Sequence, residues 1–147
     1  MKEAVKAIPT CGFNVEELTT ATGMKLSVID VGGGRKLNRA MYCTGAEGLI
    51  FVVDSSDEER FSEARDELKG LLLAEATTWG IPFVVMANKQ DIPESVDPSN
   101  LIEALGLREF NCNKWTVQGT SAATGEGLRE SIETLCEMIK SFRKERR

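Results

Sequence analysis

The sequence predicts an α/β fold built on a mostly parallel sheet, and two observations carry this prediction. Residues 49–54, which are apolar up to the final Asp54, and residues 81–87 are apolar runs, as expected for strands that are covered on both faces. Segments with helical periodicity follow both runs, and strands that alternate with helices form parallel sheets with right-handed crossovers. At 147 residues, with 41% apolar and 28% charged residues, we expect one globular domain spanning residues 1–147.

An antiparallel hairpin is expected near the start of the chain. Apolar and polar residues alternate over residues 12–18 and again over residues 24–30, as in half-buried strands. Residues 19–23 between them form a turn-rich segment. A glycine triplet follows at residues 32–34, and residues 36–42 suit a short irregular helix.

The strand expected at residues 49–54 ends in a carboxylate, Asp54, and leads into a helix. Ser56 and Glu59 have the spacing of a capping box, which predicts that Ser56 is the N-cap of this helix. The apolar side chains of the helix recur on one face, at Phe61, Ala64, Leu68, Leu71 and Leu72.

Two more strand–helix units complete the predicted sheet. After the strand at 81–87, Asp97 and Pro98 predict a helix start, and Gly106 predicts its end. A short strand is expected at 115–118. A long helix with its apolar residues on one face follows, at Leu128, Ile132, Leu135, Ile139 and Phe142.

The composition excludes several classes of protein. A formal net charge of −5 disfavours a nucleic-acid-binding protein, which would carry a basic face. The chain has no His, and its four cysteines form no C-x-x-C pair, so we expect no zinc site and reduced thiols in the cytoplasm. No apolar run approaches the roughly 20 residues of a membrane span. The basic residues 143–147 suit a solvated helix end, with contact to an anionic membrane as the minority interpretation.

A ligand site is expected where the strand at 81–87 ends, because ligands of open α/β sheets lie outside the carboxyl ends of the strands. The next residues include Asn88, Lys89 and Asp91. The Asp91 carboxylate can accept two parallel hydrogen bonds, from N1–H and the exocyclic amine of guanine, and adenine has no such donor pair. Lys89 can lay its methylene stem along a flat base, and Asn88 can bond backbone across the loop. A polar turn without a ligand is the alternative reading of these three residues.

Four segments together resemble the ADP-ribosylation factor (Arf and Arf-like) family of small GTPases. They are Ile-Pro-Thr-Cys-Gly-Phe-Asn-Val-Glu at 8–16, Asp-Val-Gly-Gly at 30–33, Asn-Lys-Gln-Asp at 88–91 and Thr-Ser-Ala at 120–122. The likeness runs from about Ile8 to the C-terminus. It implies a P-loop GTPase-like three-layer sandwich and a switch controlled by GTP and GDP with Mg²⁺, acting in vesicle trafficking. It also implies effector and regulator proteins that bind through residues 12–42, and a cytoplasmic protein that associates peripherally with endomembranes.

The resemblance implies a role for each matched residue. Thr10 and Asp30 would hold Mg²⁺, which prefers hydroxyl and carboxylate oxygens. Gly33 would donate its backbone N–H to the γ-phosphate. Five residues would form the guanine site, namely Asn88, Lys89, Asp91, Ser121 and Ala122. Among them, Ser121 would shape the loop and the Ala122 N–H would donate to the guanine carbonyl.

The sequence departs from the family at the phosphate side. No G-x-x-x-x-G-K-S/T run is present, and Met1 stands only nine residues before Thr10. We therefore expect an N-terminally truncated domain that lacks the first strand, the phosphate loop and the first helix. About five hydrogen bonds to charged groups, each worth roughly 1.5–3 kcal/mol, would be lost, which is enough to abolish tight nucleotide binding. Gly34 stands where the family has the glutamine that orients water, so no catalytic residue is expected and hydrolysis should be very weak or absent.

Two questions stay open at the level of sequence. In the family fold the missing strand lies between the strands that end at Asp30 and Asp54. These two strands could pair directly, another chain could fill the gap, or the chain could be unstable. The alternative function is a pseudo-GTPase, an interaction module that binds its partners without nucleotide, with the hairpin at 12–30 as its surface.

Overall fold

The computed structural model describes residues 13–20, 23, 25–31, 47–73, 80–110 and 113–145. The glycine triplet and the expected helix at 36–42 lie outside these ranges. The elements in chain order are the strands and helices β1 (Phe13–Thr19), β2 (Lys25–Val31), β3 (Leu49–Asp54), the 3₁₀ helix η1 (Glu58–Arg60), α2 (Phe61–Leu73), β4 (Phe83–Asn88), α3 (Pro98–Ala104), the 3₁₀ helix η3 (Leu107–Glu109), β5 (Trp115–Gly119) and α4 (Leu128–Glu145).

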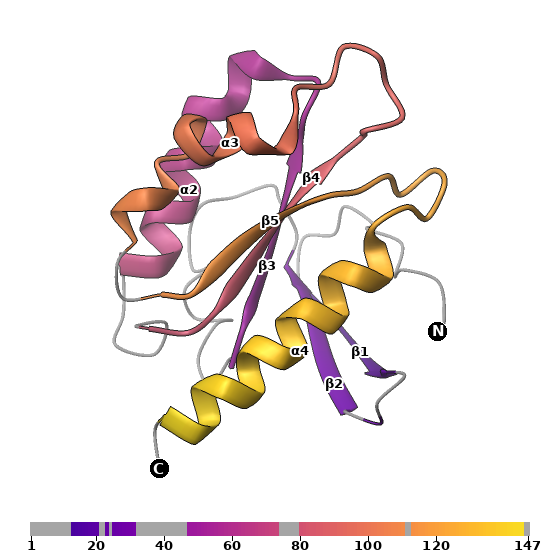
Figure 1. Cartoon of the computed structure of the whole chain (residues 1–147), viewed down its shortest axis with the longest axis vertical. Helices are drawn as coiled ribbons and strands as arrows, with labels where there is room; N and C mark the ends of the chain where they lie inside the picture. The colour runs from indigo at the N-terminus through magenta and orange to yellow at the C-terminus, as the bar shows by residue number, and fades with distance from the viewer. Residues whose placement is uncertain are drawn as a thin grey trace.

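The described strands form two separate sheets, whereas the sequence left open how the strands that end near Asp30 and Asp54 would be joined. β1 and β2 pair as an antiparallel hairpin, with Phe13 opposite Val31 and Thr19 opposite Lys25. β3, β4 and β5 form a parallel sheet with β4 in the centre (Figure 1). Each of its strands is followed by a helix, so the three predicted strand–helix units and the parallel sheet are confirmed.

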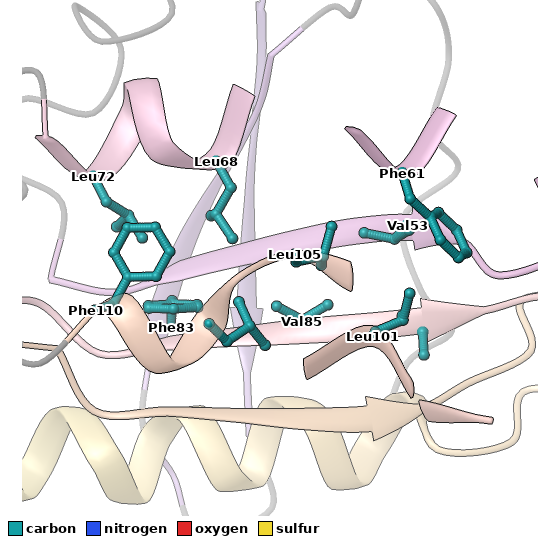
Figure 2. Packing of buried hydrophobic residues seen from close by; sticks show 11 residues of the cluster. Val53, Phe61, Leu68, Leu72, Phe83, Val85, Leu101, Leu105 and Phe110 are labelled. Atoms are coloured by element: carbon teal, nitrogen blue, oxygen red, sulfur yellow. The ribbon is translucent and has the colours of Figure 1, made fainter. Parts of the chain in front are cut away.

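Helices lie on both sides of the three-stranded sheet (Figure 1). In Figure 1, α2 and α3 lie on one side of it and α4 on the other. Successive side chains of a strand point to opposite faces, so β4 contributes to both layers. The larger apolar cluster fills the space under α2 and α3 (Figure 2), with the Phe83 and Phe110 rings edge to face at 5.8 Å between centroids. The smaller cluster joins Val84 to Leu135 and Ile139 of α4. This arrangement confirms the three-layer sandwich.

β3 differs from the prediction for its apolar run. We expected it to be covered on both faces, but Val52 is 58% exposed, and Val53 is the only residue of the strand that is buried. The reason is position. Among the described strands β3 pairs with β4 alone, so it lies at the edge of the parallel sheet. β2 pairs with β1 in a separate sheet, and direct pairing of β2 with β3 is therefore not the arrangement that the structure adopts.

The helix starts show one confirmed prediction and one wrong one. Asp97 caps α3 and accepts a hydrogen bond from the Ser99 N–H at 2.9 Å, as predicted. Ser56 is not an N-cap. Its N–H and its hydroxyl both donate to Oδ1 of Asp54, at 2.9 and 2.6 Å. An aspartate bonds readily to the backbone two residues later, and here that local turn takes the place of the expected capping box.

The loop before α4 depends on glycine at a close backbone approach. Gly127 has φ +75°, and a Cβ there would lie 2.0 Å from the carbonyl oxygen of Gly119. We predict that Gly127→Ala destabilises the protein by about 1–2 kcal/mol through the left-handed backbone and by about 1–3 kcal/mol more through the clash. Gly125→Ala is the matched control, because Gly125 has φ +86° but open space around it. In chemical unfolding, the free energy of unfolding should be lower for Gly127→Ala than for Gly125→Ala. Equal free energies of unfolding would refute the clash.

Candidate functional site

The carboxyl ends of the three parallel strands meet at one edge of the sheet. Asp54, the last residue of β3, is paired in register with Asn88, the last residue of β4. Ala87 is paired with Gly119, the last residue of β5, and the Thr120 N–H donates to the Ala87 carbonyl at 3.0 Å. The polar residues that follow these strands are therefore brought together, as the sequence predicts.

Asn88 joins the loops that follow β4 and β5. Its carbonyl oxygen Oδ1 accepts hydrogen bonds from the Thr120 hydroxyl and from the Ala122 N–H, both at 3.1 Å. The bond to Ala122 confirms that Asn88 bonds backbone across the site. Asn88 thus sets the distance between the two loops that carry the expected base-binding residues.

Asp91 is held by Ser121 and keeps one oxygen for a ligand. The Ser121 hydroxyl donates to Oδ1 of Asp91 at 2.9 Å, and the Thr124 N–H donates to the same hydroxyl at 3.2 Å. Ser121 is fully buried, whereas Asp91 is exposed. Among the contacts of the described residues, the second oxygen of Asp91, Oδ2, accepts no hydrogen bond. The Ser121 hydroxyl thus orients the carboxylate through Oδ1, and Oδ2 has no partner among the described residues.

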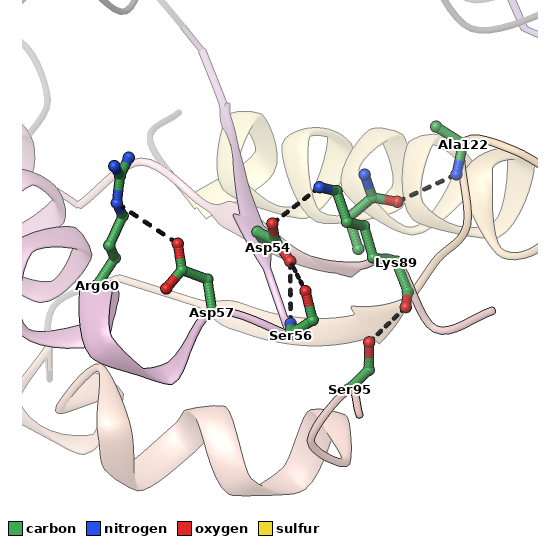
Figure 3. A network of polar contacts seen from close by, with 8 residues as sticks. Asp54, Ser56, Asp57, Arg60, Lys89, Ser95 and Ala122 are labelled. Atoms are coloured by element: carbon green, nitrogen blue, oxygen red, sulfur yellow. Dashed lines mark hydrogen bonds and ion pairs between the residues drawn. The ribbon is translucent and has the colours of Figure 1, made fainter. Parts of the chain in front are cut away.

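Lys89 turns back toward β3. Its φ of +67° is the one positive value among the described non-glycine residues. The Ser95 hydroxyl donates to its carbonyl oxygen, and its ammonium lies 2.9 Å from Oδ2 of Asp54 (Figure 3). The ion pair raises the pKa of Lys89. Partial burial acts to raise the pKa of Asp54, but the hydrogen bonds from Ser56 and Lys89 outweigh it and lower that pKa to about 2.

Asp54 is the residue to which the sequence assigned no role in the site. Its position at the end of an apolar strand marked it as a strand-end carboxylate, like Asp30. Its ion pair with Lys89 depends on the register of β3 and β4 and on the backbone turn at Lys89. Neither can be read from spacing along the chain.

The described structure does not test the roles expected of the metal and phosphate residues. Thr10 and Gly33 lie outside the described residues, and Asp30 lies in β2 opposite Asn14 of the hairpin. Within the described ranges, no group of three or more His, Cys, Asp or Glu residues could hold a metal ion. The roles of Thr10, Asp30 and Gly33 stay predictions.

The chemistry of the cluster suits a guanine base. The Asp91 carboxylate can accept from donors on the base, and the Ala122 N–H can donate to the carbonyl of the base. The methylene stem of Lys89 offers an apolar surface to the face of the base. A parallel α/β sheet with these residues at its carboxyl edge is the arrangement expected of a small GTPase domain. The profile of the ADP-ribosylation factor family matches residues 1–139. The chain therefore belongs to this family and is an Arf-like small GTPase.

Members of this family generally bind GTP and GDP with Mg²⁺ and interact with effector and regulator proteins. None of the helices in the described part of the chain is both long enough and apolar enough to cross a membrane.

Proposed function

We propose that this chain is a guanine-nucleotide-dependent switch domain in which base recognition is retained and the hold on the phosphates is weakened. The observation that carries the proposal is the orientation of Asp91. Ser121 bonds Oδ1 of its carboxylate at 2.9 Å, while Oδ2 has no partner among the described residues. Each carboxylate oxygen can accept two hydrogen bonds, so Oδ2 and the remaining lone pair of Oδ1 can accept the paired donors of guanine, whereas adenine has no such donor pair.

The other residues of the cluster complete base recognition. The methylene stem of Lys89 would lie along the base while its ammonium stays on Asp54. The Ala122 N–H, which donates to Asn88, would share its hydrogen with the guanine carbonyl. Ser121 orients Asp91, and Asn88 keeps the two loops at the separation that the base requires.

The expected weakness of nucleotide binding concerns the residues that would bind the phosphates. The chain has no G-x-x-x-x-G-K-S/T run, and the residues expected there are Gly33 for the γ-phosphate and Thr10 and Asp30 for Mg²⁺. A γ-phosphate and Mg²⁺ would supply the charge that orders a switch loop in such proteins. Without the phosphate cradle, and with Gly34 in place of the glutamine, we propose weak nucleotide binding and no hydrolysis by this chain.

The cellular role follows from the class of protein. We propose a single switch domain over residues 1–147 that acts in vesicle trafficking in the cytoplasm and at endomembranes. Effector and regulator proteins would bind through residues 12–42, of which the structure describes the β1–β2 hairpin. Among the described strands the hairpin pairs with no third strand, and an unpaired strand edge suits a partner that adds a strand.

GTP with Mg²⁺ should shift the melting temperature of this chain very little. Ligand stabilisation grows with the ratio of free ligand to Kd, so a ligand at concentrations below its Kd adds less than about 0.4 kcal/mol. Differential scanning fluorimetry with micromolar GTP and Mg²⁺ measures this. A shift of several degrees would show that the phosphates are held tightly, and would contradict the proposed weak binding.

A nucleotide-independent interaction module is the second candidate function. The observation that favours it is that the base-recognition loops are held by bonds within the protein, from Lys89 to Asp54, from Ala122 to Asn88 and from Ser121 to Asp91. Such loops keep their shape without a ligand. Capture of partner proteins that is unchanged by GTP, GDP or a chelator would favour this module over the switch.

A further inference from the structure

We propose that Asp54 is a positioning residue for base recognition. It holds the ammonium of Lys89 away from Asp91, so that the lysine stem faces the base and the Asp91 carboxylate stays open. This inference rests on the proposed guanine site, and it assigns to that site a residue from a strand, β3, that contributes none of the expected base contacts.

The Asp54 carboxylate is fixed on both of its oxygens. Oδ1 accepts from the N–H and the hydroxyl of Ser56, at 2.9 and 2.6 Å. Oδ2 lies 2.9 Å from the ammonium of Lys89 (Figure 3). Because Ser56 sets the direction of the carboxylate, Oδ2 presents a fixed point to the end of a flexible lysine side chain. An anchored end reduces the number of conformations that the stem must give up when a base binds.

The alternative partners of Lys89 show why this choice matters. Asp57 and Asp91 both lie close enough to act on its charge. Asp57 is in contact with Arg60, at 3.4 Å. Asp91 is two residues from Lys89, and its Oδ2 accepts no hydrogen bond from the described residues, so an ammonium released from Asp54 would compete with the base for that oxygen. The pairing with Asp54 keeps the cation of the loop and its base-binding anion apart.

The expected effect is modest because the pair is partly exposed. The side chains of Lys89 and Asp54 are 48% and 36% accessible, and ion pairs at such positions are strongly screened by solvent. Loss of the Asp54 charge should therefore lower the affinity for GMP about two- to fivefold. The value of the experiment lies in whether this loss depends on Lys89.

A double-mutant cycle tests the dependence. The affinities of the full chain for GMP and for IMP, which lacks the exocyclic amine, are measured by NMR titration. The variants are Asp54→Asn, Lys89→Met and the two combined. Asn keeps an oxygen for Ser56 and Met keeps an apolar stem, and thermal unfolding of each variant checks the fold. Asp57→Asn is the matched control, because it removes a nearby charge that has no contact with the lysine.

The proposal expects Asp54→Asn to weaken GMP binding in the presence of Lys89 and to have no effect on the Lys89→Met background. Equal losses on both backgrounds, no loss at all, or an equal loss from Asp57→Asn would overturn it. An NMR titration of the Lys89 ammonium tests the ion pair independently, and the pKa of this ammonium should fall in Asp54→Asn. A wild-type chain that binds GMP no better than IMP would refute the proposed function itself. That failure is seen before any variant is made, whereas a failure of this inference is seen only in the cycle.

Discussion

Asp91→Ala is expected to reduce the affinity for GMP by about a hundredfold or more and to abolish the preference for GMP over IMP. The carboxylate accepts two hydrogen bonds from guanine in the proposed site, and bonds to charged groups contribute roughly 1.5–3 kcal/mol each. Their loss corresponds to about 3–6 kcal/mol, and each 1.4 kcal/mol is about tenfold in affinity. NMR titration of the wild-type and variant chains with both nucleotides measures the change.

The control for this substitution comes from the same loop. Glu94 is exposed, three residues after Asp91, and Glu94→Ala removes a negative charge without touching the base-recognition residues. It should leave GMP binding within a factor of two of wild type. Asp91→Ala also leaves the buried Ser121 hydroxyl without this partner, so thermal unfolding must show that the variant is folded. A folded Asp91→Ala chain that still prefers GMP would remove the basis of the proposed function.

Most of the fold could be predicted because its strands and helices carry strong local patterns. The apolar run at 49–54 corresponds to β3 residue for residue, and the run at 81–87 contains most of β4. Asp97, Pro98 and Gly106 mark the ends of α3 correctly, because capping and left-handed backbone are properties of single residues. Parallel pairing followed from the alternation of strands and helices alone.

The errors arose where a neighbour in space or in the chain decides the outcome. Val52 has the same apolar character as the valines of β4, and only its place at the sheet edge exposes it. Ser56 has the right spacing for a capping box, but Asp54 two residues earlier takes both of its hydrogens. A motif that is matched by spacing alone does not show that a neighbouring carboxylate competes for the same hydrogen bonds.

The candidate site shows the same division. Asn88, Lys89, Asp91, Ser121 and Ala122 were predicted as one group, and the structure brings them together at the carboxyl edge of the sheet. The role of Asp54 could not be predicted, since it needs the register between two strands. Spacing along a chain identifies which residues share an edge, whereas the partner of each charge depends on the three-dimensional arrangement.

Phe83→Ala is expected to destabilise the protein by about 3–5 kcal/mol, the range for removing a large aromatic side chain from a packed core. Phe83 is fully buried, begins the central strand β4 and packs against the ring of Phe110. It is opposite Leu49 of β3 and Trp115 of β5, so the cavity would lie where all three strands meet. Domains of this size are stable by about 5–15 kcal/mol, so the loss should appear as a large drop in the urea midpoint.

Two further variants distinguish the loss of stability caused by a cavity in the core from the loss caused by any substitution in the sheet. Phe83→Leu keeps much of the buried volume and should destabilise less than Phe83→Ala, because the loss scales with the cavity that remains. Val52→Ala lies in the same sheet but on an exposed position, and its effect should stay within about 0.5 kcal/mol. If Phe83→Ala were no more harmful than Val52→Ala, the cluster under α2 and α3 would not be the core that holds the strand ends together. The base-recognition residues would then lack the rigid support on which their geometry depends, because Asn88 is the last residue of β4 and is positioned only as well as that strand is packed.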